Sequence, residues 1–461
     1  MISPSSPSFL TRNDVTEYHA QCVVNAPGHR WLLSSQTGIG KSGQAITAFK
    51  QLGYKHILIV CPAVVRLHWV KQLDQFWPDH SAIGLIHAGK ANTSLSKKKV
   101  AQLADAYHAP IQIVSYQLLK HVDIDGWEGI IWDEAHRIKT PDAKVSKVAQ
   151  TMVRANTSAA IVAVTATPVA NAPLDICGVV EQICPGRMGG IGPYGLQKKC
   201  KARYAQTIPC EYALSGVKYT GCNPYNVEEL RARVAAMSSR TTRAEVAHLL
   251  PAFDVVHKPI TGKADSFQSA VEVKLGAAME WLEDNQDNDH LCLLAFRRDT
   301  ARKVKERLLE ADCGYEVFTI TGAIPPGKRN EMLDQAAKAG RSIVVATMDS
   351  IGIGIDLTFC PVALVLELSY KPEVVIQALG RFSRFSSTVP GNVTILSVIG
   401  TPDEKIADII CEKIANINAT VQPGQTELEL EKALGGCADF AELAKQAAGA
   451  WVDFEIGDDD E

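Results

Sequence analysis

The sequence of 461 residues lacks the features that would assign it at once to a special class of protein. Basic and acidic side chains nearly balance, at 47 and 51, so no overall basic excess indicates a nucleic-acid partner. No apolar run approaches the roughly 18 residues that a membrane-spanning helix needs. Apolar residues make up 46% and charged residues 21%, which excludes a mainly disordered chain, a collagen-like rod and a coiled coil.

The cysteines form no pattern that indicates a disulfide framework or a zinc site. Twelve are diluted over the whole chain, and several lie inside apolar runs, where a free cysteine behaves as a small core residue. Cys184, Cys200, Cys210 and Cys222 contain no closely spaced pair of the kind that structural zinc sites use. The first ten residues carry no basic side chain and do not resemble a secretory signal. We expect a reduced, intracellular protein in the cytoplasm of a bacterium or a virus-infected cell, and not a secreted one.

The acidic residues gather at the end of the chain. The last ten residues hold six of them and no basic residue, so the rest of the chain has 47 basic and 45 acidic side chains. A locally basic groove is therefore compatible with the composition. The acidic tail either shields such a groove or binds a protein partner, and the sequence leaves both alternatives open.

Short β-branched runs alternate with helical patterns through most of the chain, which is typical of an α/β fold with parallel sheets. Glycine, tyrosine and basic residues become more frequent after about residue 175, where the alternation stops. No internal repeat is evident, and no hairpin can be recognised. We predict two parallel-sheet lobes, a mainly helical insertion, a linker and a tail, with these bounds: lobe 1, residues 1–175; insertion, 176–250; linker, 251–265; lobe 2, 266–420; helical and acidic tail, 421–461.

A glycine-containing loop between an expected strand and an expected helix predicts a phosphate-binding site. The loop includes Thr37, and Gly38 and Gly40 let backbone N–H groups approach an anion at the start of the helix. Lys41 is placed to reach the β- and γ-phosphates, and the Ser42 hydroxyl to bind Mg²⁺. The alternative is a simple glycine turn between strand and helix.

Two acidic residues end another apolar strand. Asp133 is placed to hold Mg²⁺ and Glu134 to orient and deprotonate an attacking water, because the carboxyl ends of parallel strands face the ligand crevice. A solvated Asp-Glu turn is the alternative. Thr165 and Thr167 close the next strand, where their hydroxyls either relay changes at the nucleotide or only cap a turn.

These three segments together resemble motifs I, II and III of superfamily 2 helicases. Over residues 11–398 the chain resembles the Swi/Snf-type DNA translocases of that superfamily. The further segments that carry the resemblance are Cys61-Pro62-Ala63 with Trp69 (motif Ia), Arg240–Pro251 (the joint between lobes), Leu291–Phe296 (motif IV), Thr321-Gly322 with Arg329, Gly352–Thr358 (motif V) and Gln377–Arg384 (motif VI). Tyr204, Gly216 and Glu229-Leu230 are similar to the branch that includes annealing helicases.

The resemblance implies two RecA-like lobes that bind ATP and Mg²⁺. It implies that Gln21 reads the adenine, that Gly354 and Asp356 belong to the ATP site, and that Arg381 and Arg384 reach the γ-phosphate as catalytic cations. Residues that would grip a nucleic-acid backbone without reading its sequence are Pro62, Ala63, Arg66, Thr140, Thr347 and Ser350. Residues that would couple the nucleotide to movement are His136, Thr165, Thr167 and Gln377.

Three functions remain open from the sequence. The first is a monomeric, DNA-dependent ATPase that translocates on duplex or forked DNA in replication, repair or recombination, by remodelling forks, annealing strands or displacing proteins. The second is a superfamily 2 helicase that separates the strands of DNA or RNA. Asp356 and Gly380 keep this alternative open, because the translocases usually carry asparagine and an acidic residue there. The third is a nucleotide-gated binding protein without productive turnover.

Overall fold

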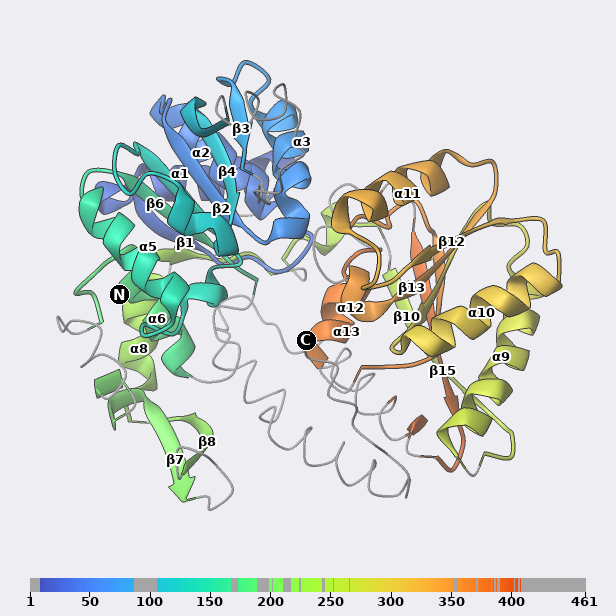
Figure 1. The fold of residues 1–461 in the computed structure, drawn as a ribbon. Helices are drawn as coiled ribbons and strands as arrows, with labels where there is room; N and C mark the ends of the chain where they lie inside the picture. The colour runs from blue at the N-terminus through green and yellow to red at the C-terminus, as the bar shows by residue number, and fades with distance from the viewer. Residues whose placement is uncertain are drawn as a thin grey trace, which may run out of the picture. The chain divides into compact units, whose positions relative to one another are not determined.

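The computed structural model describes residues 9–86, 106–166, 173–188, 199–200, 202–209, 217–223, 225–242, 245–251, 253–264, 266–351, 355–369, 372–382, 384, 387, 390–401, 403–404 and 407. They divide between Leu249 and Leu250 into two compact units, each with its own parallel sheet (Figure 1). The predicted α/β fold with two parallel-sheet lobes is therefore confirmed. The tail at 421–461 lies outside the described residues.

The sheet of unit 1 has seven strands in the order β3-β4-β2-β5-β6-β1-β9, and all its neighbours are parallel. The strands are β1 (Arg30–Leu33), β2 (Ile57–Cys61), β3 (Ile83–Leu85), β4 (Ile111–Ser115), β5 (Gly129–Asp133), β6 (Ala160–Val164) and β9 (Ser238–Ser239). Val164 is in register with both Leu33 and Asp133, so β1, β5 and β6 end at the same level of the sheet. The segments that follow these strands therefore meet at one edge.

Helices cover both faces of this sheet. Alternate strand residues such as Trp132 and Ile161 pack in one apolar cluster with α5 and α6, while Gly129 lies against Phe49 of α2 on the opposite face. The helices are α1 (Arg12–Val24), α2 (Lys41–Leu52), α3 (Arg66–Phe76), α5 (Lys144–Ala155), α6 (Pro173–Ile183) and α8 (Val227–Ala235). The short 3₁₀ segments are η1 (Pro27–His29), η2 (Ala63–Val65), η3 (Tyr116–His121), η4 (Ala135–Ile138) and η5 (Ala247–Leu249).

Helix α6 lies in direct contact with the segment that follows β5. A Cβ atom added at Gly178 would stand 1.8 Å from the backbone oxygen of Lys139, one residue beyond η4. Only glycine allows this approach, because no real Cβ atom lies so close to a backbone atom. The helix thereby supports the chain directly after the two acidic residues.

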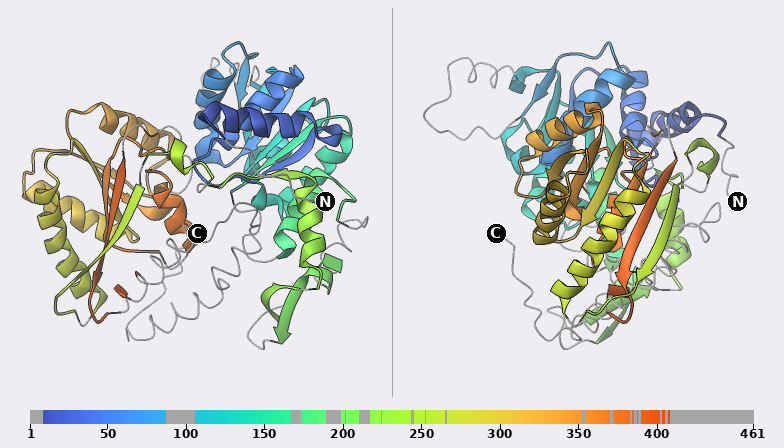
Figure 2. Two further views of the ribbon diagram at one scale, coloured as in Figure 1. Left: turned by 180° about the vertical axis from the view of Figure 1, so that it is seen from behind. Right: turned by 90° about the vertical axis from the view of Figure 1, so that its right-hand side faces the viewer.

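The region predicted as a mainly helical insertion also contains strands. β7 (Ala205–Pro209) and β8 (Val217–Cys222) form an antiparallel hairpin that is a separate two-stranded sheet. Figures 1 and 2 show this hairpin extending from the level of α8, away from the parallel sheet of its own unit. β9, from the same region, joins the parallel sheet beside β1. The prediction missed these strands because none is a long β-branched run.

The sheet of unit 2 has six parallel strands in the order β10-β15-β14-β11-β13-β12. The strands are β10 (Phe253–Ile260), β11 (His290–Ala295), β12 (Glu316–Ile320), β13 (Ser342–Thr347), β14 (Val362–Val365) and β15 (Gly391–Val398), and the helices are α9 (Phe267–Asp284), α10 (Arg298–Glu310), α11 (Pro326–Lys338), α12 (Met348–Ile351) and α13 (Pro372–Leu379). Residues 253–260 have a strand-like pattern but fall within the predicted linker at 251–265; they form the edge strand β10, which pairs with β15 along its whole length.

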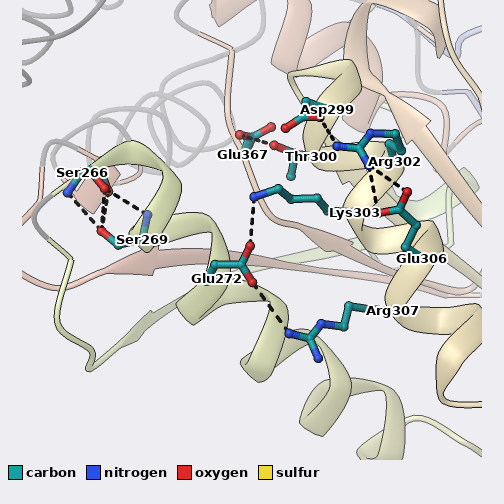
Figure 3. A network of polar contacts seen from close by, with 10 residues as sticks. All are labelled: Ser266, Ser269, Glu272, Asp299, Thr300, Arg302, Lys303, Glu306, Arg307 and Glu367. Atoms are coloured by element: carbon teal, nitrogen blue, oxygen red, sulfur yellow. Dashed lines mark hydrogen bonds and ion pairs between the residues drawn. The ribbon is translucent and has the colours of Figure 1, made fainter.

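Polar side chains fix the helices of unit 2 on its sheet (Figure 3). Glu367 is 3% exposed and accepts hydrogen bonds from the backbone N–H groups of Phe296 and Arg297 and from the Thr300 hydroxyl. It thus satisfies donors at the start of α10, where an acidic group is favourable. Glu272 of α9 pairs with Lys303 of α10 at 2.9 Å.

In the part of the chain that the structure describes, no helix is both long enough and apolar enough to cross a bilayer.

Candidate functional site

The loop after β1 has the backbone geometry of an anion-binding site. Gly38 and Gly40 have φ angles of +84° and +77°, in the left-handed region that glycine enters without strain. Gly40 is the N-cap of α2, so the turn directs the first N–H groups of that helix toward the loop. The predicted residues Thr37, Lys41 and Ser42 lie on this loop or in the first turn of α2.

Lys41 folds back over the loop. Its Nζ donates hydrogen bonds to the backbone oxygens of Ser35, at 2.5 Å, and Gln36, at 3.0 Å. These contacts hold the ammonium group at the loop, where it is available to exchange carbonyl partners for phosphate oxygens. That Lys41 binds a triphosphate stays a prediction from the sequence.

The segment around β9 runs alongside the loop and continues the sheet past the end of β1. The N–H groups of Ser34 and Gln36 donate to the backbone oxygens of Ser239 and Thr241, both at 3.0 Å. Thr241 N–H donates in return to the Ser35 hydroxyl at 3.1 Å. The chain that the resemblance describes as the joint between lobes is therefore bonded directly to the phosphate loop within unit 1.

His19 lies at the centre of these contacts, and no pattern in the sequence indicated its role. Its Nδ1 is 2.7 Å from Ser239 Oγ, and its Nε2 is 2.8 Å from Thr241 Oγ1 and 3.1 Å from Ser35 Oγ. Burial lowers the pKa of His19 to about 3, and the positive charge of Lys41 acts in the same direction. The imidazole is therefore neutral at pH 7, and it joins α1, the loop and the β9 segment.

Gln21, which the sequence predicts to read the adenine, lies on the surface of α1. Gln21 is exposed, and its Nε2 donates to Gln51 Oε1 at 3.0 Å. Gln51 lies ten residues after Lys41 on α2, which places this contact about 15 Å along the helix from the phosphate loop. Of this part of α1, it is His19 and not Gln21 that contacts the loop, because the two residues lie on different faces of the helix.

Asp133 ends β5 and Glu134 follows it, at the same edge of the sheet as the loop. Asp133 Oδ2 accepts from Trp69 Nε1 at 2.8 Å, and Oδ1 accepts from the Glu134 N–H at 3.0 Å. Burial raises the pKa of Asp133 to about 7, with a further increase from the Glu134 carboxylate, while Trp69 and Lys41 oppose it. Trp69, recognised in the sequence as part of motif Ia, thus has the additional task of orienting Asp133.

Glu134 has a left-handed backbone, with φ at +51°, which is rare for a residue with a side chain. Such strain is of order 1–3 kcal/mol and is kept where the surrounding structure fixes it. His136 Nδ1 lies 3.3 Å from both Glu134 Oε2 and Thr165 Oγ1. The structure therefore brings together three of the residues predicted to act in catalysis and coupling. Thr167 lies outside the described residues.

The donor set at this edge fits Mg²⁺. A carboxylate from Asp133 and a hydroxyl from Ser42 are the oxygen ligands that this ion prefers. The carboxylates of Asp133 and Glu134 lie close together and repel each other, and a divalent cation would relieve this repulsion. Within the described residues, no three His, Cys, Asp or Glu side chains form a group that could hold a metal ion. Mg²⁺ is commonly held by one or two carboxylates together with substrate phosphates.

In unit 2 the segments of motifs V and VI are bonded to each other. Arg384 Nη2 donates to the backbone oxygen of Ile355 at 2.7 Å, and Nη1 lies 4.0 Å from Asp356 Oδ2. Burial lowers the pKa of Arg384, while Asp356 acts against this shift. Leu357 N–H donates to the backbone oxygen of Arg381 at 3.2 Å. Gln377 lies on α13, and Gly354 falls outside the described residues.

The residues predicted to grip nucleic acid are not equally accessible. Ala63 and Thr140 are exposed, whereas Pro62 is buried. Arg66 is bonded to its own unit, with Nε donating to the backbone oxygen of Ala63 at 3.1 Å and Nη1 donating to that of Ile86. Its guanidinium therefore supports the chain around η2 in this conformation.

Thr347 and Ser350 are each 4% exposed. The Ser350 hydroxyl donates to the backbone oxygens of Ile320 and Thr347 within unit 2, at 2.8 and 2.7 Å. The structure therefore contradicts the prediction that these two hydroxyls face a nucleic acid, because they are buried and Ser350 is bonded internally.

Comparison with known proteins assigns both parts of the chain. Residues 17–259, more than half of the chain, match the SNF2-related domain, and residues 273–386 match the helicase conserved C-terminal domain. One similar curated protein is the Xenopus tropicalis SWI/SNF-related matrix-associated actin-dependent regulator of chromatin subfamily A-like protein 1, which is 23% identical over 84% of this chain and 42% of the relative. Another is the Mus musculus DNA annealing helicase and endonuclease ZRANB3, which is 21% identical over 90% of this chain and 41% of the relative. The chain thus spans about two fifths of the length of these relatives.

A solved structure supports the fold. The S. cerevisiae protein Dbp5, bound to RNA and ADP BeF3, matches with a TM-score of 0.54 at 11% identity, over 95% of this chain and 93% of that chain. At this identity the likeness shows the two-lobed fold alone. The motif resemblance found in the sequence is confirmed by the two family matches, and the chain belongs to the family of proteins with an SNF2-related domain followed by a helicase C-terminal domain.

Proposed function

We propose that this protein is an ATP-hydrolysing motor that translocates on double-stranded DNA, and that it remodels forks, anneals strands or displaces bound proteins. The observation that carries the proposal is the meeting of the phosphate loop with Asp133 and Glu134 at one edge of the unit 1 sheet. The names of the relatives, an annealing helicase and a SWI/SNF-related regulator, support DNA as the partner.

The residues of unit 1 divide the chemistry between them. Lys41 and the N–H groups of the loop bind the phosphates of ATP. Ser42 and Asp133 would hold Mg²⁺, which neutralises charge on the phosphates. Glu134 orients and deprotonates the attacking water, and its strained backbone fixes the direction of its carboxylate. In this proposal Arg381 and Arg384 stabilise the charge on the γ-phosphoryl group, which rests on their match to motif VI.

The ATPase rate of the purified full chain tests the proposal, measured without nucleic acid and with blunt duplex DNA, forked DNA, single-stranded DNA and RNA. Duplex or forked DNA should stimulate the rate. Lys41→Ala should abolish binding and turnover, while Glu134→Gln should retain ATP binding and lose turnover, because it keeps the side-chain size and removes the base. Arg384→Ala should also abolish turnover. Full turnover in Lys41→Ala or Arg384→Ala, or stimulation by RNA alone, would contradict the proposal.

The second candidate is a helicase that separates strands of DNA or RNA. The β7–β8 hairpin is the observation that favours testing it, because strand separation needs a projecting element that parts the two strands. Displacement of a third strand from a triplex reports translocation on a duplex, and release of one strand from a partial duplex reports strand separation. A motor of the proposed kind displaces the third strand without releasing the duplex strand. Action as a monomer inside the cell, and a protein partner at the acidic tail, are further parts of the proposal.

A further inference from the structure

We propose that the base of the β7–β8 hairpin is a separate nucleic-acid contact, in which Tyr225 stacks on an unpaired base and nearby guanidinium groups bind the adjoining phosphates. The proposal rests on the function proposed above, because that function supplies DNA as the partner. It adds a site on unit 1 that is distinct from the phosphate loop and from the predicted backbone-gripping residues.

Tyr225 is the most exposed of the large apolar side chains in the described part of the chain, at 92%. The backbone at Tyr225 is nevertheless held by hydrogen bonds to Asn223. Tyr225 N–H donates to Asn223 Oδ1 at 3.0 Å, and Asn226 N–H donates to the backbone oxygen of Asn223 at 3.1 Å. These hydrogen bonds restrain the backbone that carries the exposed ring, so stacking on the ring orders less of the chain there.

The turn is bonded to the base of the hairpin. Asn223 N–H donates to the backbone oxygen of Tyr204 at 2.8 Å, and Asn226 Nδ2 donates to that of Arg203 at 2.8 Å. A two-stranded sheet alone is only marginally stable in water. These contacts therefore attach the hairpin to the segment at the start of α8 that contains Tyr225. They also place Tyr225 near the backbone at Arg203.

The segment of sequence that carries the ring has more basic than acidic residues. Residues 187–233 contain eight basic and three acidic side chains, although the whole chain has a net charge of −4. The side chains of Arg203 and Arg233 are 56% and 41% exposed, and both pair with Glu229. Glu229 also accepts from the Tyr204 hydroxyl at 3.0 Å, and the Arg203 bond is the first cause that lowers the pKa of Glu229 to about 2. The carboxylate stays charged and holds the two guanidiniums in one place.

An exposed aromatic ring beside phosphate-binding cations is the combination that binds single-stranded nucleic acid. The faces of bases in the interior of a duplex are covered by their neighbours, so along the strands the ring can stack only on unpaired bases. A forked or single-stranded DNA supplies both the unpaired bases and the phosphates. The site would thus favour junctions over blunt duplex.

Fluorescence anisotropy of the full chain with a labelled single strand, a fork and a blunt duplex tests the site. Tyr225→Ala should weaken binding to the single strand and the fork by roughly 5- to 150-fold, the range for loss of one stacked base. Tyr225→Phe keeps the ring and should bind as the wild type does. Ile124→Ala, at another exposed apolar position of unit 1, is the control and should leave binding unchanged.

The phosphate contacts have a test of their own. Arg203→Gln should lower the slope of log affinity against log salt by about 0.7 for single-stranded DNA, the value for one phosphate contact. Arg302→Gln is the matched control, because Arg302 is 57% exposed and also ion-paired, but lies in unit 2. An unchanged slope for Arg203→Gln, or an equal change in the control, would overturn the role of Arg203.

The other outcomes separate this proposal from the general function. Unchanged single-strand and fork binding by Tyr225→Ala, an equal loss in Tyr225→Phe, or an equal loss on blunt duplex would each overturn stacking on an unpaired base. Duplex-stimulated ATPase activity of Tyr225→Ala checks that the variant is folded and reports the proposed motor independently. If no DNA stimulates the ATPase activity of the wild type, the proposed function fails. If DNA stimulates the wild type but Tyr225→Ala binds the single strand and the fork as the wild type does, the hairpin site alone fails.

Discussion

Replacing His19 by glutamine should remove an acid sensitivity from the stability of unit 1. The imidazole is fully buried among Ser35, Ser239 and Thr241, and its pKa is about 3, against 6.5 for a histidine in the unfolded chain. Below pH 6.5 the unfolded chain binds a proton that the folded chain excludes. His19 therefore places no penalty on folding above pH 6.5, and stability is lost as the pH falls from there toward 3.

The size of the effect follows from the two pKa values. Each pH unit below 6.5 lowers the free energy of unfolding by about 1.4 kcal/mol, so the loss between pH 7.5 and pH 5 is about 2 kcal/mol. Asp133 acts in the opposite direction, because its pKa is raised to about 7 and the folded chain gains a proton as the pH falls. The wild type alone therefore does not report His19, and the difference between wild type and variant is needed.

Urea unfolding followed by tryptophan fluorescence measures this difference. Five of the seven tryptophans, at positions 31, 69, 77, 127 and 132, lie in unit 1, so its unfolding dominates the signal. His19→Gln can still bond the surrounding hydroxyls and does not titrate. The stability of the variant relative to the wild type should rise by about 2 kcal/mol from pH 7.5 to pH 5. Parallel stability curves over this range would refute the assignment of His19 as a buried neutral group.

Three further predictions concern the supports of the site. Gly178→Ala should lower the free energy of unfolding by about 1–3 kcal/mol, measured by urea or thermal unfolding, because its Cβ would meet the backbone oxygen of Lys139; unchanged stability would contradict the close contact. Trp69→Phe removes the N–H that binds Asp133, and should lower the ATPase rate at saturating ATP while a fluorescent ATP analogue still binds; an unchanged rate would show that this hydrogen bond does not orient the carboxylate. Glu367→Gln should lower the free energy of unfolding by about 1–3 kcal/mol, because the charge-assisted hydrogen bonds at the start of α10 are lost. Glu272→Gln, on the surface, should change it much less. Equal losses in the two variants would contradict the difference in burial.

The sequence was sufficient for those parts of the site that local order determines. A strand, a Gly38–Gly40 turn and a helix follow each other within a few residues, and the same holds for β5 and the acidic pair at Asp133 and Glu134. Parallel strands bring their carboxyl ends to one edge, so the meeting of these segments followed from the alternation of strands and helices. No long-range contact had to be guessed to predict this edge.

The parts that the sequence could not supply depend on pairing across long separations. β9 is two residues long and becomes a strand only because the chain from Met237 to Thr241 bonds to β1 and the loop, some two hundred residues earlier. The strand-like pattern of β10 is local, but its place in the second sheet follows only from its pairing with β15, more than a hundred residues later. Local patterns cannot contain such information, because short strands are defined by their partners and not by their own composition.

The same reasoning explains why the sequence analysis singled out Gln21 and did not recognise His19. Both residues lie on α1, two positions apart, and motif resemblance favoured the glutamine because of its chemistry. On a helix, however, two positions turn a side chain by about 200°, so only one of the two can face the loop. Burial decides which: His19 is neutral and satisfied by three hydroxyls from two segments, whereas Gln21 remains at the surface with Gln51. A contact at the phosphate loop therefore had to be identified from the packing of α1, and the hydroxyls of Ser239 and Thr241 are what make a buried histidine stable there.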